Sequence, residues 1–236
     1  MTEISPTLRA YSQGGNAAPP RHLGSRYNDA SGFLPEPGNT VVCHLVPGSA
    51  TEAALVEVRQ RFLDMPGNLL FTPTSSLHMT LFQGIIETRR EPGFWPRGIA
   101  LDSPIDAMTD LMEQRLEGIG IAAPFSVEVT GARPSGLIVA GRTAADRVAM
   151  RAWRDAFAAL WGYRHPDHED YLFHITFAYP VAWLDDALLP AWQATLDHAV
   201  ADLRASVPVL ELKPPAFCSF NDMNHFEELR VLPFRG

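Results

Sequence analysis

The sequence predicts an α+β protein whose sheets are mainly antiparallel. Its 236 residues are 46% hydrophobic and 19% charged, which is ordinary for a globular protein and excludes global disorder and fibrous repeats. This length suits a single domain. Helical and strand patterns alternate loosely along the chain, yet many strands are short and several are joined by tight turns. This order favours antiparallel sheets over a doubly wound parallel sheet.

The first expected elements follow an N-terminal arm. Residues 1 to about 39 are rich in Gly, Pro, Asn and Ser, and we interpret them as an arm that wraps the body of the protein. A strand is expected over 40–46 and ends at Pro47-Gly48. Thr51 is a candidate N-cap for the following helix. The apolar face of this helix consists of Leu55, Val58 and Phe62.

A strand with two different faces is expected over residues 76–86. Its positions alternate between one wholly apolar face and one that carries His78, Thr80 and Phe82. A second helix is expected to begin at Ser103-Pro104, with proline at its first position. The apolar stripe of that helix consists of Ile105, Met108, Met112 and Leu116.

The second half of the chain predicts two longer helices and several strands. Thr143 with Asp146 resembles a capping box, which opens one helix, and another helix is expected over 185–204 with Pro190 in its first turn. The strands are expected over 125–130, 136–140, 171–179, 207–212, 216–220 and 229–232.

Charge restricts the partners. Asp and Glu total 27 against 19 for Lys and Arg, so the formal net charge is −8. Proteins that bind long nucleic acids carry a basic surface, because their affinity comes largely from neutralising phosphates. We therefore expect no long nucleic acid as partner, whereas a small anionic ligand in a local pocket is compatible with this charge.

The location is predicted from three further features. No apolar run reaches the roughly 18 to 20 residues of a membrane span, and the first residues lack the pattern of a secretory signal. Cys43 and Cys218 each lie in a hydrophobic run, and we expect buried free thiols. Together these features predict a cytoplasmic protein without a membrane partner.

The most informative feature is a His-x-Thr pattern that occurs twice. The first copy is Leu77-His78-Met79-Thr80-Leu81, and the second is Phe173-His174-Ile175-Thr176-Phe177. With 8 histidines in the chain, about 0.4 such triplets are expected by chance. In each copy His and Thr are two positions apart, so on a strand both side chains point to the same face. The flanking apolar residues indicate that the opposite face is buried.

These side chains suit the binding of a phosphoryl group. An imidazole titrates near neutrality and can give or take a proton, and a hydroxyl can donate a hydrogen bond to a phosphate oxygen. Two such strands brought together supply an acid, a base and two oxygen donors around one phosphorus atom. Displacement at a cyclic phosphate needs this set of groups and no metal.

The paired motifs resemble those of the two-histidine (2H) phosphoesterase superfamily, which includes RNA 2′,5′ ligase-like cyclic phosphodiesterases. The resemblance spans about residues 33–180 and is closest to one subgroup of bacterial and fungal members. Further stretches that carry it are Pro37-Gly38-Asn39-Thr40, Trp95-Pro96 and His165-Pro166-Asp167-His168.

This resemblance implies a bilobal, pseudo-twofold α+β fold of one domain, with antiparallel sheets flanked by helices and a central cleft. One His-x-Thr strand would come from each side. The resemblance further implies that His78 protonates the leaving oxygen, that His174 activates water, and that Thr80 and Thr176 bind phosphate oxygens, with no cofactor.

Most other polar residues of interest are better explained by structural roles than by functional ones. His165, His168, Glu169 and Asp170 lie close together in sequence, but their spacing favours a polar loop over a metal site. Tyr171 lies at the start of the second strand and is a candidate for substrate binding, whereas Tyr179 is expected in the core. The remaining candidates are His44, expected as a hydrogen-bonded core residue, and His225, in a polar loop of undecided role.

The leading hypothesis from the sequence is a metal-independent phosphodiesterase that opens a 2′,3′-cyclic or related cyclic phosphate on a small nucleotide-like substrate. A non-catalytic nucleotide or phosphate sensor would use the same residues and is the main alternative. A metal-dependent hydrolase built on His165 and His168 is a third hypothesis.

Overall fold

The computed structural model describes residues 3–29, 31–120 and 123–234. A seven-stranded sheet, in the order β4-β5-β6-β3-β1-β8-β9, is antiparallel throughout. Its strands are β1 (Gly38–His44), β3 (His78–Ile86), β4 (Val127–Arg133), β5 (Gly136–Gly141), β6 (His174–Thr176), β8 (Ala216–Phe220) and β9 (Glu227–Val231). A smaller antiparallel sheet pairs β2 (Leu69–Phe71) with β7 (Ala178–Pro180). The predicted α+β class with mainly antiparallel sheets is confirmed.

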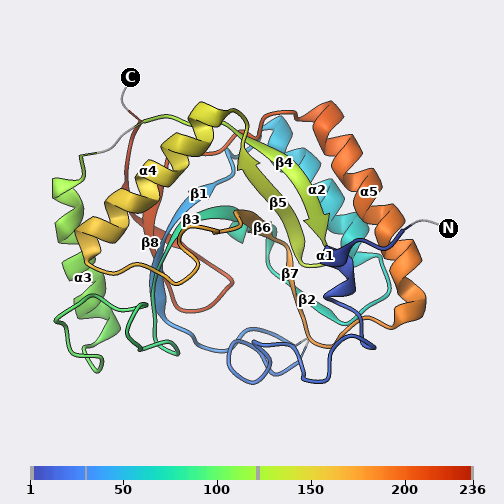
Figure 1. Ribbon diagram of the computed structural model, residues 1–236, viewed down its shortest axis with the longest axis horizontal. Coiled ribbons are helices and arrows are strands. Elements are labelled where there is room, and N and C mark those ends of the chain that lie inside the picture. The colour runs from blue at the N-terminus through green and yellow to red at the C-terminus, as the bar shows by residue number, and fades with distance from the viewer. Residues whose placement is uncertain (1–2, 30, 121–122, 235–236) are drawn as a thin grey trace.

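Helices cover the outer side of the curved seven-stranded sheet, and segments of the N-terminal arm run past its open side (Figure 1). The helices are α1 (Pro6–Arg9), α2 (Ala50–Leu63), α3 (Ile105–Arg115), α4 (Ala144–Trp161) and α5 (Leu189–Ser206). Short 3₁₀ turns occur at Thr74–Ser76, Leu116–Gly118 and Asp186–Leu188. Among the described residues, no helix is both long enough and apolar enough to cross a membrane.

The main core lies between this helical layer and one face of the sheet. Met79 and Ile175, from the two central strands, are fully buried there together with Leu137 of β5. Large aromatic side chains of the helices complete this core, among them Trp153, Phe157, Trp161 and Trp192. Their burial removes large apolar areas from water and so stabilises the sheet against its helices. The opposite face of the central strands is left for polar residues.

Several element boundaries follow from local capping chemistry. The predicted capping box is present, since Thr143 and Asp146 each bond to the other's backbone N–H at the start of α4. The N-cap of α2 is Ser49 rather than the predicted Thr51, because the Ser49 hydroxyl accepts from the Glu52 N–H while Thr51 is buried. Pro190 lies in the first turn of α5 as predicted. Cys43 and Cys218 are buried free thiols, also as predicted.

Two predicted strands differ in the structure. The expected strand over 171–179 is divided into β6 and β7, which belong to different sheets. The break occurs at Phe177, whose N–H donates to the Ser135 carbonyl instead of continuing the ladder. The expected strand over 207–212 is not a named strand and is reduced to isolated bridges at Leu210 and Leu212.

A β-bulge in the β1–β3 pair changes the face of the residues beyond it. Val42 pairs with Thr80 but Val41 pairs with Phe82, so Leu81 is an extra residue in β3. Phe82, predicted on the polar face, is therefore buried in the main core against Phe157 and Trp161. Gln83 is turned to the same face as Thr80.

Candidate active site

The two His-x-Thr motifs meet by direct strand pairing. In the β3–β6 pair Met79 lies opposite Ile175. In an antiparallel register this places His78 opposite Thr176 and Thr80 opposite His174. Since Met79 and Ile175 point into the main core, the four polar side chains lie together on the other face. The motifs are thus neighbours in one sheet. The resemblance implied a different arrangement, with one motif strand on each side of a cleft.

The register also sets the spacing of the two histidines. Residues directly opposite in an antiparallel pair have Cβ atoms about 4.5–5.5 Å apart, and diagonal neighbours are about 7–8 Å apart. His78 and His174 are diagonal neighbours, and each has a threonine directly across from it. His78, Thr80, His174 and Thr176 thus form a square, which we call the catalytic square, with the histidines at one pair of opposite corners and the threonines at the other. A phosphate group above its centre would be surrounded by two imidazoles and two hydroxyls.

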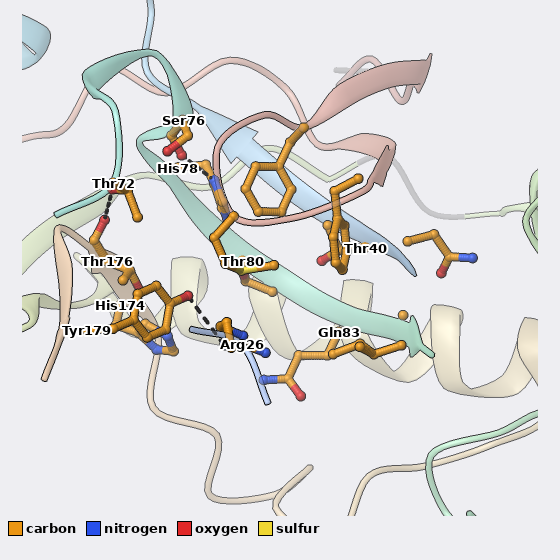
Figure 2. Close-up of a pocket in the computed structure, with 16 residues that line it drawn as sticks. Arg26, Thr40, Thr72, Ser76, His78, Thr80, Gln83, His174, Thr176 and Tyr179 are labelled. Atoms are coloured by element: carbon orange, nitrogen blue, oxygen red, sulfur yellow. Dashed lines mark hydrogen bonds between the residues drawn. The ribbon is translucent and has the colours of Figure 1, made fainter. Parts of the chain in front are cut away.

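A cavity of about 110 Å³ opens over these four residues (Figure 2). One water molecule needs about 10–15 Å³, so the cavity has room for a group considerably larger than water. His78, Thr80, His174 and Thr176 all line it. The other lining residues are Arg26, Asn39, Thr40, Thr72, Ser76, Gln83, Gly84, Ile86, Tyr179, Phe220, Met223 and Phe226.

Both histidines are held in the same way by the backbone two residues earlier. The Nδ1 atom of His78 lies 2.7 Å from the Ser76 carbonyl oxygen, and Nδ1 of His174 lies 2.8 Å from that of Leu172. A carbonyl oxygen can only accept, so Nδ1 carries the proton in each ring. In the neutral ring Nε2 is then the basic nitrogen, and it can bond to a ligand in the cavity.

The pKa values of both histidines are lowered. Burial lowers the pKa of His78 to about 3, with the neighbouring His44 contributing in the same direction. Burial likewise lowers the pKa of His174 to about 4, and the charge of Arg133 adds to this effect. Both rings are therefore neutral near pH 7 and able to accept a proton. An anion bound between them would favour the imidazolium form and raise both pKa values.

His44 is a neighbour of the site that the sequence interpretation assigned to the core. It is hydrogen-bonded as predicted, since its Nδ1 lies 3.0 Å from Oε1 of Glu228. However, it is half-buried, and it lies directly opposite His78 in the β1–β3 pair with the two ring centroids 5.8 Å apart. His44 therefore belongs to the surroundings of His78.

Tyr171 and Tyr179 differ from the sequence prediction in their position relative to the cavity. Tyr171, the candidate for substrate binding, does not line this cavity; its ring lies 4.0 Å from the Arg154 guanidinium. Tyr179, expected in the core, does line the cavity. For Tyr179 the reason is the break at Phe177, after which the alternation of faces predicted for one regular strand no longer holds, whereas Tyr171 precedes β6 and is not part of a strand.

The remaining histidine candidates lie elsewhere. His165 and His168, interpreted as part of a polar loop, are both buried, at 4% and 2% exposure. His165 packs against Phe82 and Phe94, and His168 Nε2 lies 2.9 Å from an Asp155 oxygen. Neither residue, nor His225, lines the cavity. Across residues 3–29, 31–120 and 123–234, no group of three or more His, Cys, Asp or Glu is placed to hold a metal ion.

Some lining residues had no distinctive sequence signal. Arg26 comes from the N-terminal arm, in a segment whose composition indicates only a loop. Gln83 reaches the cavity because of the bulge, which hydrophobic alternation does not indicate. Phe226 follows β8 in a turn, and its ring centroid lies 4.2 Å from that of His78. The backbone that brings these residues to the motifs depends on long-range pairing.

Comparisons with known proteins give three findings. The family model 2H-phosphodiest, described as a domain of unknown function (DUF1868), matches residues 26–138. The crystal structure of a conserved protein of unknown function from Agrobacterium tumefaciens strain C58 is similar, with 54% sequence identity and a TM-score of 0.95. The match covers 97% of this chain and 100% of that one. A comparison with curated proteins finds no match.

Proposed function

Because this chain belongs to the 2H phosphodiesterase family, we propose that it opens the ring of a 2′,3′-cyclic or related cyclic phosphate on a small nucleotide-like substrate, without a metal ion. The observation that supports this most directly is the pairing of β3 with β6, which gathers two histidines and two threonines over one cavity. Acid, base and phosphate ligands are thereby available within the span of one phosphate group.

In the proposed reaction His174 acts as the base. Its Nε2 takes a proton from a water molecule, whose oxygen forms a bond to phosphorus. His78 acts as the acid: its imidazolium gives a proton to the ring oxygen as the bond from that oxygen to phosphorus breaks. The proton and electron balance closes with one phosphomonoester as product. His174 suits the base role because it is the more open of the two, whereas His78 is enclosed between His44 and Phe226.

The threonines stabilise the charge that develops on phosphorus. Thr80 and Thr176 lie diagonally across the same square as the histidines, so their hydroxyls can donate to the two non-bridging oxygens. No metal ion is required in this scheme, since the imidazolium and the two hydroxyls together oppose the phosphate charge.

The test uses a panel of cyclic phosphates, comprising nucleoside 2′,3′-cyclic phosphates and ADP-ribose 1″,2″-cyclic phosphate, with phosphorus NMR to identify products. His78→Ala and His174→Ala should each lower turnover by about 10²- to 10⁴-fold, the usual effect of removing an acid or a base. His198→Ala, which removes an exposed histidine of α5, is the matched control and should retain activity. Activity should also persist in EDTA.

Three outcomes would contradict the proposal. Turnover that is unchanged in both active-site variants would remove the histidines from the chemistry. Loss of activity in EDTA, restored by a metal ion, would remove the metal-independent scheme. Binding of the panel without any conversion would indicate a sensor instead of an enzyme.

A further inference from the structure

Three arginines lie near one end of the cavity, although the protein is acidic as a whole. Arg21 and Arg26 come from the N-terminal arm and Arg89 follows β3. Arg26 lines the cavity, and Arg89 is hydrogen-bonded to the lining residue Gln83. Glu36 is the carboxylate that pairs with this group, through Arg26. In a chain of net charge −8 this local excess of positive charge calls for an explanation.

Arg89 is a half-buried cation without a carboxylate partner in the described part of the chain. Its Nη1 donates to Oε1 of Gln83 at 3.2 Å, and its guanidinium lies 4.3 Å from the centroid of the Phe94 ring. Its Nε and Nη2 are buried and have no hydrogen-bond partner among the described residues. Buried charges are normally paired, and donors without an acceptor are costly to bury. An anionic group is the partner that would relieve this cost.

Arg26 forms the part of this group that reaches the cavity. Its Nε lies 2.5 Å from Oε2 of Glu36, and its Nη1 donates to the Tyr179 hydroxyl at 3.4 Å. Glu36 is itself shared, since its Oε1 accepts from Thr88 at 2.7 Å. Arg26 therefore presents a guanidinium to the cavity whose positive charge is only partly offset.

The electrostatic effects on neighbouring groups agree with this geometry. Burial, followed by the charges of Arg26, Arg21 and Arg89, lowers the pKa of His22 to about 4, against the opposing effect of Glu36. The pKa of Arg89 is also lowered, first by burial and then by Arg26 and Arg21, while Tyr163 and Asp167 act in the opposite direction. The arginines are thus close enough to repel one another, and an anion between them would reduce this repulsion.

Gln83 links the cationic group to the catalytic square. It lines the cavity beside the motif residues and also accepts the hydrogen bond from Arg89. Figure 2 shows Arg26 and Gln83 beyond Thr80, away from Ser76. Thr80 pairs with Val42 and Gln83 with Thr40, so across the bulge the two positions are two residues apart along β1, about 6–7 Å at the usual rise per residue. A separation of this order suits two phosphate groups carried on opposite sides of one sugar.

We propose that Arg26, Arg89 and Gln83 form a second anion subsite, and that the substrate is a cyclic phosphate which carries a further phosphate group. This inference rests on the proposed function of the catalytic square. Guanidinium groups bind phosphates through charge-assisted hydrogen bonds. Arg26 lines the cavity, and Arg89 adds a second positive charge directly behind the lining residue Gln83. The second phosphate adds to the partial offset of Arg26 by Glu36 and supplies negative charge near Arg89, which has no carboxylate partner among the described residues.

The test compares adenosine 2′,3′-cyclic phosphate with its 5′-phosphorylated form. Wild type should prefer the 5′-phosphorylated substrate by about 10- to 100-fold in kcat/KM, the effect of one or two hydrogen bonds to a charged group. Arg89→Gln should reduce this preference about tenfold. Arg97→Gln, the same change at an exposed arginine of the neighbouring loop, is the matched control and should retain the wild-type preference.

A binding measurement keeps this test independent of turnover. Calorimetry with adenosine 2′,5′-bisphosphate and adenosine 2′-monophosphate should show tighter binding of the bisphosphate, and Arg89→Gln should remove most of the difference. Equal affinity for the two ligands, or an equal effect of Arg89→Gln on both, would overturn the second subsite even if the cyclic phosphate is hydrolysed. Absence of hydrolysis together with a bisphosphate preference would instead refute the proposed reaction alone.

Discussion

At the scale of single residues, the site depends on two imidazoles with the same tautomer. Each Nδ1 donates to a backbone carbonyl two residues earlier, so Nε2 is the nitrogen available to a ligand in both rings. In the proposed reaction, acid and base are then distinguished by protonation state. Because burial lowers the pKa of both rings, the charge of the bound phosphate has to restore the imidazolium of the acid.

This dependence predicts different pH profiles for the free enzyme and its substrate complex. The profile of kcat/KM reports the free enzyme, and its optimum should lie in the acidic range, near the lowered pKa values of about 3 and 4. The profile of kcat reports the complex, in which the phosphate raises both pKa values, so its optimum should lie at higher pH. Steady-state kinetics from pH 3 to pH 8 checks this; coincident optima would contradict it.

The threonine hydroxyls should contribute to kcat through the transition state. Thr80→Val and Thr176→Val keep the shape of each side chain and remove the donor, so each is expected to lower kcat by about 10- to 100-fold. Thr7→Val, at an exposed position of α1, is the matched control. Steady-state kinetics of the three variants provides the measurement. An effect on KM alone would indicate binding of the ground state only.

At the scale of elements, the meeting of β5 with β6 depends on a glycine. Gly136 lies opposite Thr176 with φ +140°, and a Cβ atom there would lie 2.1 Å from the Ile175 carbonyl oxygen. Any side chain would therefore push β5 away from the strand that carries His174 and Thr176. The glycine permits the close approach that places β6 in the sheet.

Gly136→Ala is accordingly expected to destabilise the protein by about 2–4 kcal/mol, from backbone strain together with the steric conflict. Gly24→Ala is the control, because Gly24 also has a positive φ, of 85°, but has no atom within 4 Å of the added Cβ. It should cost only the conformational strain, about 1 kcal/mol. Urea unfolding of both variants makes the comparison, and equal losses would show that the close approach does not matter.

The elements also show what the sequence can predict. Capping residues and apolar stripes are patterns within a short stretch of sequence. They predicted the start of α4 and the core face of α3. The break at Phe177 and the bulge at Leu81 are imposed by partners distant in sequence, Ser135 and β1. Their consequences, the burial of Phe82 and the appearance of Gln83 and Tyr179 in the cavity, could not be read from alternation alone.

The same distinction applies to the candidate site. The two His-x-Thr motifs were identified from sequence because each is a complete local pattern, and strand geometry alone places His and Thr on one face. That β3 and β6 are neighbours requires the whole sheet. Arg26 lies in an arm whose position is determined by contacts such as the Tyr27 hydroxyl donating to the Pro180 carbonyl at 2.7 Å. Such contacts leave no periodic signal.

At the scale of the whole molecule, buried histidines connect stability to pH. Burial is the largest cause of the lowered pKa of six histidines, including His44 and His168. In four of them it lowers the pKa from 6.5 to about 3 (His78 and His165) or to about 4 (His22 and His174). Between these values and 6.5 the unfolded chain binds more protons than the folded protein. The free energy of unfolding therefore decreases as the pH falls below about 6.5.

We expect the urea midpoint to be constant near pH 7.5 and to fall progressively between pH 6.5 and pH 4.5. His165→Leu removes one of these groups and should make the decline shallower, whereas His198→Leu, at an exposed position, should not. Circular dichroism during urea titration at each pH provides the measurement. A midpoint that does not change over this range would show that the pKa values of these histidines are the same in the folded and unfolded states.

The strand pairing at the centre of the sheet has one more consequence. A slip of β6 by a single residue along β3 would turn His174 and Thr176 inward and Ile175 outward, while His78 and Met79 stay in place through the pairing of β3 with β1. Correct registration and catalytic competence are therefore one event, with no separate assembly of the reaction centre after folding. Denaturant should abolish turnover and tertiary structure along the same curve.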